Sequence, residues 1–350
     1  MIYPILVLLI VFLEIFKYQK KDTRLDRLYS NILWIILVLM AAFRGQSVGA
    51  DTSSYTEDYE MMPMLSFYQV SIVKQGYLGY FFPCKFFSLI GAPLWMWFGF
   101  VEGLYVYAMY CFVRKYSHDR IYSILIFVTN GLFTFSMAGQ KQVMSMALML
   151  LAFMYYTNKK YLKMVLAVLW AAACHSSGYI FLIAFALYPL RHSKLFMFVA
   201  VGVPISIYVL SKVFMQQIVA LLIISKEGSD HYENYLNLDT TYSPVTLIFY
   251  LGAILMAVMF IKSYWENYKK EVFFIYFMCF MTCALQSLSA INPTLFRLAL
   301  PYAPFLMVLL PNTSSSIRSH QRRLFYNYAI WAWHIGYFLI TTKQPYEFNF

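Results

Sequence analysis

The residues best suited to chemistry are positively charged or titratable side chains that stand at the ends of hydrophobic runs. They are Arg44, Lys141, His175 and Arg297. Guanidinium and ammonium groups bind phosphate oxygens well, and histidine exchanges protons near neutral pH. Together with the carboxylate of Asp51, which is described next, the two arginines and the lysine suit a substrate that carries a phosphate or a diphosphate.

The most informative stretch is residues 43–55, which begins where a hydrophobic run ends. Arg44 supplies a cation, Asp51 supplies a carboxylate, and Thr52 and Tyr55 supply hydroxyls, while two intervening glycines loosen the backbone. An ordinary alternative is an arginine that snorkels to the membrane surface and is followed by a plain polar loop.

Lys141 stands between Gln140 and Gln142 with no acidic neighbour, a pattern that indicates an anion site. A lysine at the membrane interface with no influence on topology would give the same pattern. His175 separates Ala-Ala-Ala-Cys from Ser-Ser-Gly at the end of a hydrophobic run, where a lone histidine is also common as a hydrogen-bonded packing residue.

Arg297 follows Asn-Pro at the start of a late hydrophobic run. A charged side chain in hydrocarbon costs roughly 3 kcal/mol, so this arginine needs a partner or a function. Glu14 and Glu102 lie deep in two other runs and rank second, because either could simply pair with a tyrosine or with the backbone.

The composition indicates the elements that must position these residues. Of 350 residues, 61% are hydrophobic and only 12% are charged, whereas a soluble domain has about a quarter charged residues. Apolar runs close to the length of a membrane span recur, and a span must be helical to satisfy its own backbone. We therefore predict a single all-α, polytopic membrane domain over residues 1–350. The expected spans are 2–16, 29–44, 94–113, 120–138, 141–157, 161–174, 176–190, 195–211, 244–262, 271–290, 295–311 and 324–342.

Charge sets the expected orientation. Most of the 27 basic residues fall in alternate connections, which we assign to the cytoplasmic face, so both termini are expected outside. The remaining basic residues are Arg44, Lys74, Lys85, Lys141, Lys212, Lys226, Arg297 and Lys343. Two outer segments are long: 45–93, with an apolar part at 77–90 that we expect to lie in the interface or re-enter the membrane, and 212–243, which could be a mobile lid or a passive connector.

The chain lacks the sequence motifs of several classes of enzyme. The chain has no P-loop, dinucleotide fingerprint, HExxH or nucleophile elbow, which argues against ATP-driven chemistry. Its net charge of +11 is spread over short loops, so we expect no nucleic-acid partner. The five cysteines form no CxxC pair and read as packing residues, and we expect no cofactor or metal, although the acidic residues near Glu57 could attract a cation.

These stretches together resemble the EpsG family of bacterial polysaccharide polymerases, which are Wzy-like membrane proteins. The matching positions are Arg44 with Val48-Gly49-Ala50-Asp51-Thr52-Ser53-Ser54-Tyr55 (R…VGxDTxxY), Lys141-Gln142 with Ala147 (RQ…A), His175-Ser176-Ser177 (HxS), Arg297 with Tyr302 and Pro304, and the Gln344-Pro345-Tyr346 tail (YPY). Two positions depart from the family pattern. Lys141 replaces the usual arginine, and Gln75 stands where an acidic residue usually precedes Gly-Tyr.

The resemblance implies a GT-C-like, inverting glycosyltransferase that joins repeat units carried on undecaprenyl diphosphate at the outer face of the cytoplasmic membrane. It implies Asp51 as the base, with His175 orienting a hydroxyl or phosphate or replacing Asp51. Arg44, Lys141 and Arg297 would stabilise the leaving diphosphate. The bilayer and a regulator of chain length are the expected partners. A flippase for lipid-linked glycans and a membrane O-acyltransferase are the alternatives.

Overall fold

The computed structural model of the chain describes residues 2–20, 23–192, 202–210, 244–268, 271–290, 293–342 and 346–348. Every regular element within these ranges is helical, which confirms the all-α prediction for this part of the chain. The expected span 195–211 falls largely outside the described residues, and the expected loop 212–243 falls wholly outside them. The chain forms two compact units, which are treated separately below.

The first unit comprises Met1–Phe185 and Trp331–Phe350. Its α-helices are α1 (Ile2–Lys20), α2 (Thr23–Ala42), α3 (Thr52–Met61), α4 (Phe67–Val73), α5 (Leu78–Leu89), α6 (Leu94–Tyr116), α7 (Arg120–Thr129), α8 (Leu132–Ala138), α9 (Gln140–Thr157) and α10 (Tyr161–Cys174). Short 3-10 turns are η1 (Met62–Met64), η2 (Gln75–Tyr77) and η3 (Ser176–Phe181). Helix α11 (Leu182–Leu187) begins here, and the last part of α19 (His320–Thr341) belongs here too.

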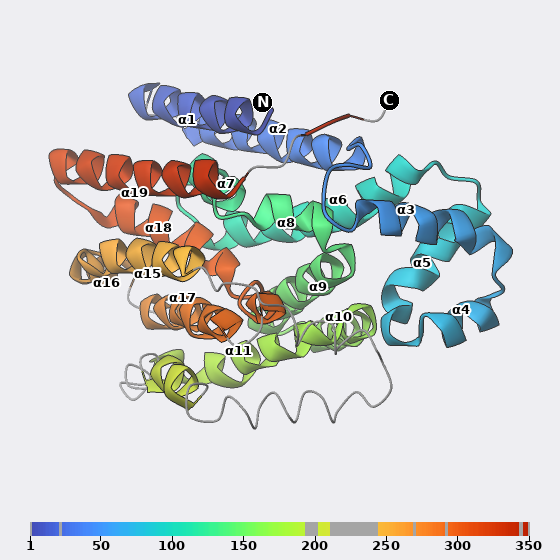
Figure 1. The fold of residues 1–350 in the computed structure, drawn as a ribbon. Helices are drawn as coiled ribbons and strands as arrows, with labels where there is room; N and C mark the ends of the chain where they lie inside the picture. The colour runs from blue at the N-terminus through green and yellow to red at the C-terminus, as the bar shows by residue number, and fades with distance from the viewer. Residues whose placement is uncertain are drawn as a thin grey trace. The chain divides into compact units, whose positions relative to one another are not determined.

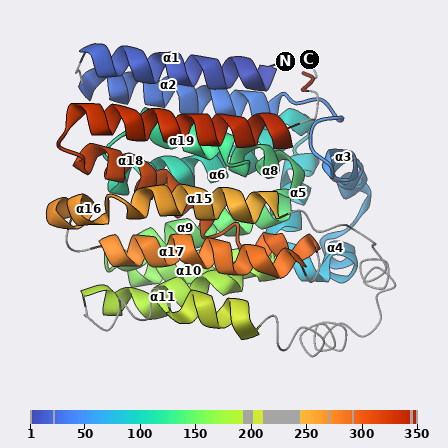
Figure 2. The ribbon, with the colours of Figure 1, turned by 60° about the vertical axis from the view of Figure 1, so that its left-hand side comes forward.

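Helix α9 forms the centre of the first unit. Its residues 142–154 are all buried, and it packs against α6 on one side and α10 on another. Helix α2 packs against α6, and α1 and α2 lie side by side in both views (Figure 1, Figure 2). The short helices α3, α4 and α5 lie together at the end of the unit where α2 stops and α6 starts (Figure 1). Helices α3, α4 and α5 therefore connect α2 to α6 at one end of the core helices.

Local sequence signals explain several helix limits. Ser66 and Gln69 form a reciprocal capping box that starts α4, and Asp119 accepts the Tyr122 N–H at the start of α7. The predicted span 120–138 is interrupted at Gly131, whose φ of +83° is a conformation that favours glycine. Helices α7 and α8 consequently meet at a 53° bend.

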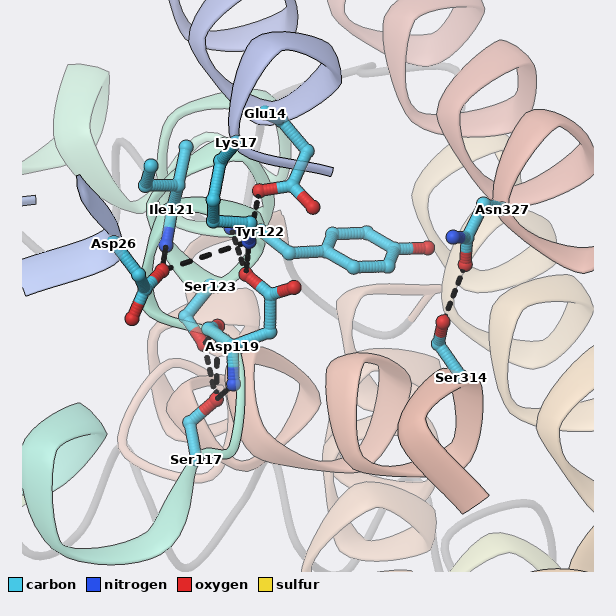
Figure 3. A network of polar contacts seen from close by, with 10 residues as sticks. All are labelled: Glu14, Lys17, Asp26, Ser117, Asp119, Ile121, Tyr122, Ser123, Ser314 and Asn327. Carbon is cyan, nitrogen blue, oxygen red and sulfur yellow. Dashed lines mark hydrogen bonds and ion pairs between the residues drawn. The ribbon is translucent and has the colours of Figure 1, made fainter. Parts of the chain in front are cut away.

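A partly buried ion cluster ties α1 and α2 to the start of α7 (Figure 3). The Lys17 ammonium lies 2.6 Å from Glu14, 3.5 Å from Asp26 and 2.5 Å from Asp119. Glu14 is therefore paired within this cluster, and its partner is a lysine instead of the tyrosine or backbone group that the sequence led us to expect. One cation here faces three carboxylates.

The second unit is Ala186–Ile330. Its described elements are η4 (Tyr188–His192), a helix over 202–210, α15 (Val245–Val258), α16 (Ile261–Tyr268), α17 (Val272–Gln286), η5 (Ser287–Ala290), η6 (Pro293–Leu298), η7 (Ala303–Phe305), α18 (Leu306–Ser316) and the first part of α19. Helix α15 packs against α17 and α18, and it meets α16 at a 63° bend.

Within the described residues, four segments are long and apolar enough to cross a membrane. They are Ile2–Gln19, Arg24–Ala42, Leu94–Tyr116 and Val272–Ala290, and the number rises to six if each bent helix pair counts as one span. The chain thus has the helices of a multi-pass membrane protein. The twelve spans, the GT-C-like arrangement and the single membrane domain stay predictions.

Candidate functional site

The segment after α2 is held by its own backbone and by Thr52. The Thr52 hydroxyl lies 2.5 Å from the Val48 carbonyl and 3.2 Å from the Met137 carbonyl, and the side chain is fully buried. Gly49 has a φ of +92°, and a Cβ there would lie 2.5 Å from the Met137 oxygen. The structure therefore gives Thr52 a structural contact to the end of α8, and the sequence led us to expect a substrate contact.

Asp51 stands at the N-cap of α3 and its side chain makes no capping hydrogen bond to the helix. A carboxylate at this position normally accepts a backbone N–H of the first turn. Asp51 is only partly buried, so part of the residue faces solvent at the start of α3. These are suitable properties for a group that accepts a proton from a substrate.

Lys141 projects into a cage of three aromatic rings. Its Nζ lies 5.5 Å from the ring centroid of Tyr55, 4.8 Å from that of Tyr77 and 4.9 Å from that of Phe81. The described residues offer it no carboxylate within ion-pair distance, although the charges of Asp58 and Asp51 act on it. Ring faces stabilise an ammonium group while leaving its N–H donors available to an anion. The structure thus brings together Asp51, Tyr55 and Lys141.

A second lysine adjoins the cage and was not a candidate from sequence. Lys74 caps the end of α4, and its Nζ lies 4.9 Å from the centroid of the same Phe81 ring. It also lies 2.6 Å from Asp58, a mostly buried carboxylate on α3. The only sequence signal for Lys74 was its place among the basic residues that orientation left unexplained. Asp58 is one of the acidic residues near Glu57, for which the sequence suggested a cation and not a lysine on another helix.

Arg44 is buried behind this site instead of lining it. Its Nη1 donates to the Ala41 carbonyl at 2.6 Å and lies 3.6 Å from Glu102, and its guanidinium carbon lies 4.2 Å from the Phe98 ring centroid. Both Arg44 and Glu102 side chains are closed to solvent. The ion pair gives Glu102, which is buried in the middle of α6, a partner of opposite charge. It also compensates the buried positive charge of Arg44.

The two glutamines beside Lys141 are both buried at the start of α9. Gln140 Oε1 accepts a 2.5 Å hydrogen bond from the Tyr80 hydroxyl, which in turn accepts from the Trp97 indole at 3.2 Å. Tyr80 also packs on Tyr55, with ring centroids 5.8 Å apart. Gln140 therefore holds Tyr80, which packs on Tyr55 of the cage, and Gln142 is also buried.

His175 lies at the end of α10, with its ring 5.7 Å from Tyr77 of the cage. Its Nδ1 accepts the Ser177 backbone N–H at 3.1 Å and lies 2.8 Å from the Ser177 hydroxyl. Because a backbone N–H can only donate, Nδ1 is unprotonated and the neutral ring carries its proton on Nε2. This tautomer favours a hydrogen-bond donor over a base at Nε2.

Tyr346 also belongs to the first unit, where its hydroxyl donates to the Met40 carbonyl at the end of α2. Burial raises the pKa of Tyr346 well above its ordinary value, so the phenol stays neutral and donates. Gln344 and Pro345 of the same motif lie outside the described residues.

Arg297 and Tyr302 belong to the second unit, in and just after η6. Arg297 is half-buried and Tyr302 is fully buried. Their participation in the site around Lys141 stays a prediction. Across the described residues of both units, no group of three or more His, Cys, Asp or Glu side chains could hold a metal ion.

The comparison that decides the family covers nearly the whole chain, because the EpsG family model matches residues 27–350. The chain belongs to the EpsG family. This confirms the resemblance seen in the motifs, and it makes the chain a polysaccharide-polymerase-like membrane protein, in a family associated with glycosyltransferase-like polymerase activity. No curated protein and no solved structure matches this EpsG family chain.

Proposed function

We propose that this EpsG family protein joins oligosaccharide repeat units carried on undecaprenyl diphosphate, at the outer face of the bacterial cytoplasmic membrane. The observation that carries the proposal is the Lys141 ammonium in its aromatic cage, where the charge of Asp51 acts on it and no carboxylate of the described residues lies at ion-pair distance. An anionic group with sugars attached fits such a site, because the rings stack on sugar faces while the ammonium binds phosphate.

In the proposed reaction a hydroxyl of the acceptor sugar attacks the anomeric carbon of the donor sugar. The new carbon–oxygen bond forms as the bond to the diphosphate breaks, so the configuration at that carbon inverts. Asp51 takes the hydroxyl proton, and the lipid diphosphate leaves with the bonding electron pair. The donor is already activated, so the step needs no nucleotide.

The charge that develops on the departing diphosphate is stabilised by Lys141. Lys74 lies on the same ring and adds a second ammonium when its pair with Asp58 opens. His175 donates from Nε2 to a phosphate or sugar oxygen, which leaves Asp51 as the base. Arg297 stays a proposed ligand of the diphosphate that its own variant tests below, and Arg44 keeps a structural role in its pair with Glu102.

The test is polymer formation by single variants in a strain that lacks the chromosomal gene. Asp51→Asn, Lys141→Ala and Arg297→Ala are expected to keep normal membrane abundance and to yield single-repeat products. The matched controls are Glu57→Gln, Lys163→Ala and Arg318→Ala, which alter exposed residues of the same charge. Normal polymer length from all three site variants would refute the proposed site.

The deletion strain itself separates the competing activities. Loss of a polymerase shortens the surface glycan to one repeat, loss of a flippase removes it, and loss of an acyltransferase changes only its decoration. Purified protein with a purified lipid-linked repeat unit, with and without a chelator, then establishes whether the reaction needs a metal.

A further inference from the structure

Residues 346–348 are bonded to the stretch that leaves α2, three hundred residues earlier in the sequence. The Gly45 N–H donates to the Glu347 carbonyl at 2.7 Å, and Arg44 pairs with Phe348 in an antiparallel bridge. The Ser47 hydroxyl donates to Glu347 Oε2 at 2.7 Å. The Tyr346 hydroxyl also donates to the Met40 carbonyl. Met40, Arg44, Gly45 and Ser47 are therefore each bonded to segment 346–348.

The contact is close as well as bonded. A Cβ at Gly45 would lie 3.2 Å from the Cβ of Glu347 and 3.3 Å from its carbonyl oxygen, so a side chain at this position would press on segment 346–348. Tyr346 packs edge-on against Tyr3 with ring centroids 5.2 Å apart, and against Phe348 at 5.0 Å. Segment 346–348 is thereby fixed on both sides, to α1 and to the exit of α2.

The stretch that it holds leads directly to the candidate site. Three residues separate Ser47 from Asp51, and the next turn of α3 carries Tyr55 of the Lys141 cage. On its other side, this stretch is anchored by Thr52 to the Met137 carbonyl. Asp51 thus stands between two anchors, one of which is segment 346–348.

We propose that Glu347 and segment 346–348 position the Asp51 carboxylate against the Lys141 cage, and that Glu347 is a positioning residue for the group transfer. The inference rests on the proposed function for its activity readout. The physical reason is that an unbraced glycine-containing loop samples many backbone conformations, and catalysis loses rate when a base strays from its productive geometry.

The first test changes the Ser47–Glu347 bond alone. Glu347→Ala removes the acceptor, whereas Glu347→Gln keeps an oxygen acceptor for the Ser47 hydroxyl and is the matched control. The Ser47–Glu347 bond is exposed, so its loss should leave the thermal midpoint and KM unchanged, whereas we expect kcat to fall about fivefold in Glu347→Ala because Asp51 is less well positioned. Glu347→Gln should restore kcat. A fall in midpoint that accounts for the lost activity, or equal rates in the two variants, would overturn the positioning role.

The second test fixes the contact covalently. The variant with Gly45→Cys and Glu347→Cys would place two Cβ atoms 3.2 Å apart, close to disulfide spacing, so it should form a disulfide on mild oxidation, should polymerise at the wild-type rate when oxidised, and should resemble Glu347→Ala when reduced. An oxidised protein that is inactive would mean that segment 346–348 must detach during the reaction, which contradicts the proposal.

A third readout does not depend on catalysis. Asp51→Cys should react faster with a water-soluble maleimide when Glu347→Ala is added, because the loop is then less restrained. If the wild-type protein fails to polymerise lipid-linked repeats, the proposed function fails while this comparison still tests the segment. Equal labelling rates with and without Glu347→Ala would refute the restraint itself.

Discussion

Arg44 and Glu102 form a buried pair, so the charge of each depends on the other. Removing one partner leaves an uncompensated buried charge that costs about 3–5 kcal/mol, whereas replacing both with apolar residues is often nearly neutral. We expect Arg44→Met and Glu102→Leu each to lower the thermal midpoint of the detergent-solubilised protein, and the double variant to recover most of the loss. Circular dichroism or dye-based melting measures this.

The same cycle separates structure from substrate binding. If Arg44→Met left the midpoint unchanged and reduced only polymerisation, Arg44 would contact the substrate in spite of its pairing. A double variant that is as stable as wild type yet inactive would show that the pair is needed for the reaction as well as for stability.

Lys141 gives the second prediction at this scale, because the three rings around it accept either kind of cation. A guanidinium stacks on aromatic faces and binds phosphate with two donors, so Lys141→Arg should keep polymer length near normal. Lys141→Met preserves much of the side-chain volume without the charge and should give mostly single repeats. Gel profiles of the surface glycan distinguish these outcomes. Equal activity of the two variants would mean that the cage, and not its charge, matters.

At the scale of elements, the loop between α2 and α3 depends on one backbone conformation at Gly49. Its φ of +92° disfavours any side chain, and a Cβ would collide with the Met137 oxygen at 2.5 Å. Gly49→Ala should therefore move Asp51 and remove most of the polymer. Gly336→Ala is the control, because a Cβ there meets nothing within 4 Å. Polymerisation at the control level in Gly49→Ala would show that the loop tolerates another path.

The ion cluster of α1, α2 and α7 makes a second prediction about elements (Figure 3). Lys17→Met would leave Glu14, Asp26 and Asp119 without their cation, so carboxylates would repel each other in a partly buried place. We expect a loss of several degrees in the thermal midpoint, partly restored by adding Glu14→Gln. Lys163→Met, an exposed lysine on α10, should change little. A midpoint in Lys17→Met that matches this control would contradict a stabilising cluster.

Hydrophobic runs predicted the helices better than they predicted the site. The run at 161–174 coincides with α10, because polar residues bound this apolar run at both ends. The run at 120–138 hid a bend, since a single Gly131 in a left-handed conformation leaves hydropathy unchanged. Lys141 and Asp51 were predicted from their polar surroundings. Lys74 and Asp58 were missed because their pairing joins α3 to the end of α4, and no periodicity specifies that contact.

At the scale of the whole molecule, the distribution of basic residues predicts which ends of the helices face the cytoplasm. Ser53 should then lie outside, whereas Lys163 and Ser319 should lie inside, and all three are exposed in the structure. Cysteines introduced singly at these positions can be labelled in intact cells with a membrane-impermeant maleimide. The parent protein is a suitable background, because four of its five cysteines are buried and Cys111 is half-buried.

We expect labelling of Ser53→Cys in intact cells, and labelling of Lys163→Cys and Ser319→Cys only after the membrane is permeabilised. The reason is that Lys and Arg flanking short loops are retained on the cytoplasmic side, and an external Asp51 is required if the acceptor sugar arrives from outside. Labelling of Ser53→Cys only after permeabilisation would place Asp51 and Tyr55 in the cytoplasm. The site would then face nucleotide-linked donors, and polymerisation of lipid-linked repeats at the outer leaflet would be the wrong reaction for it.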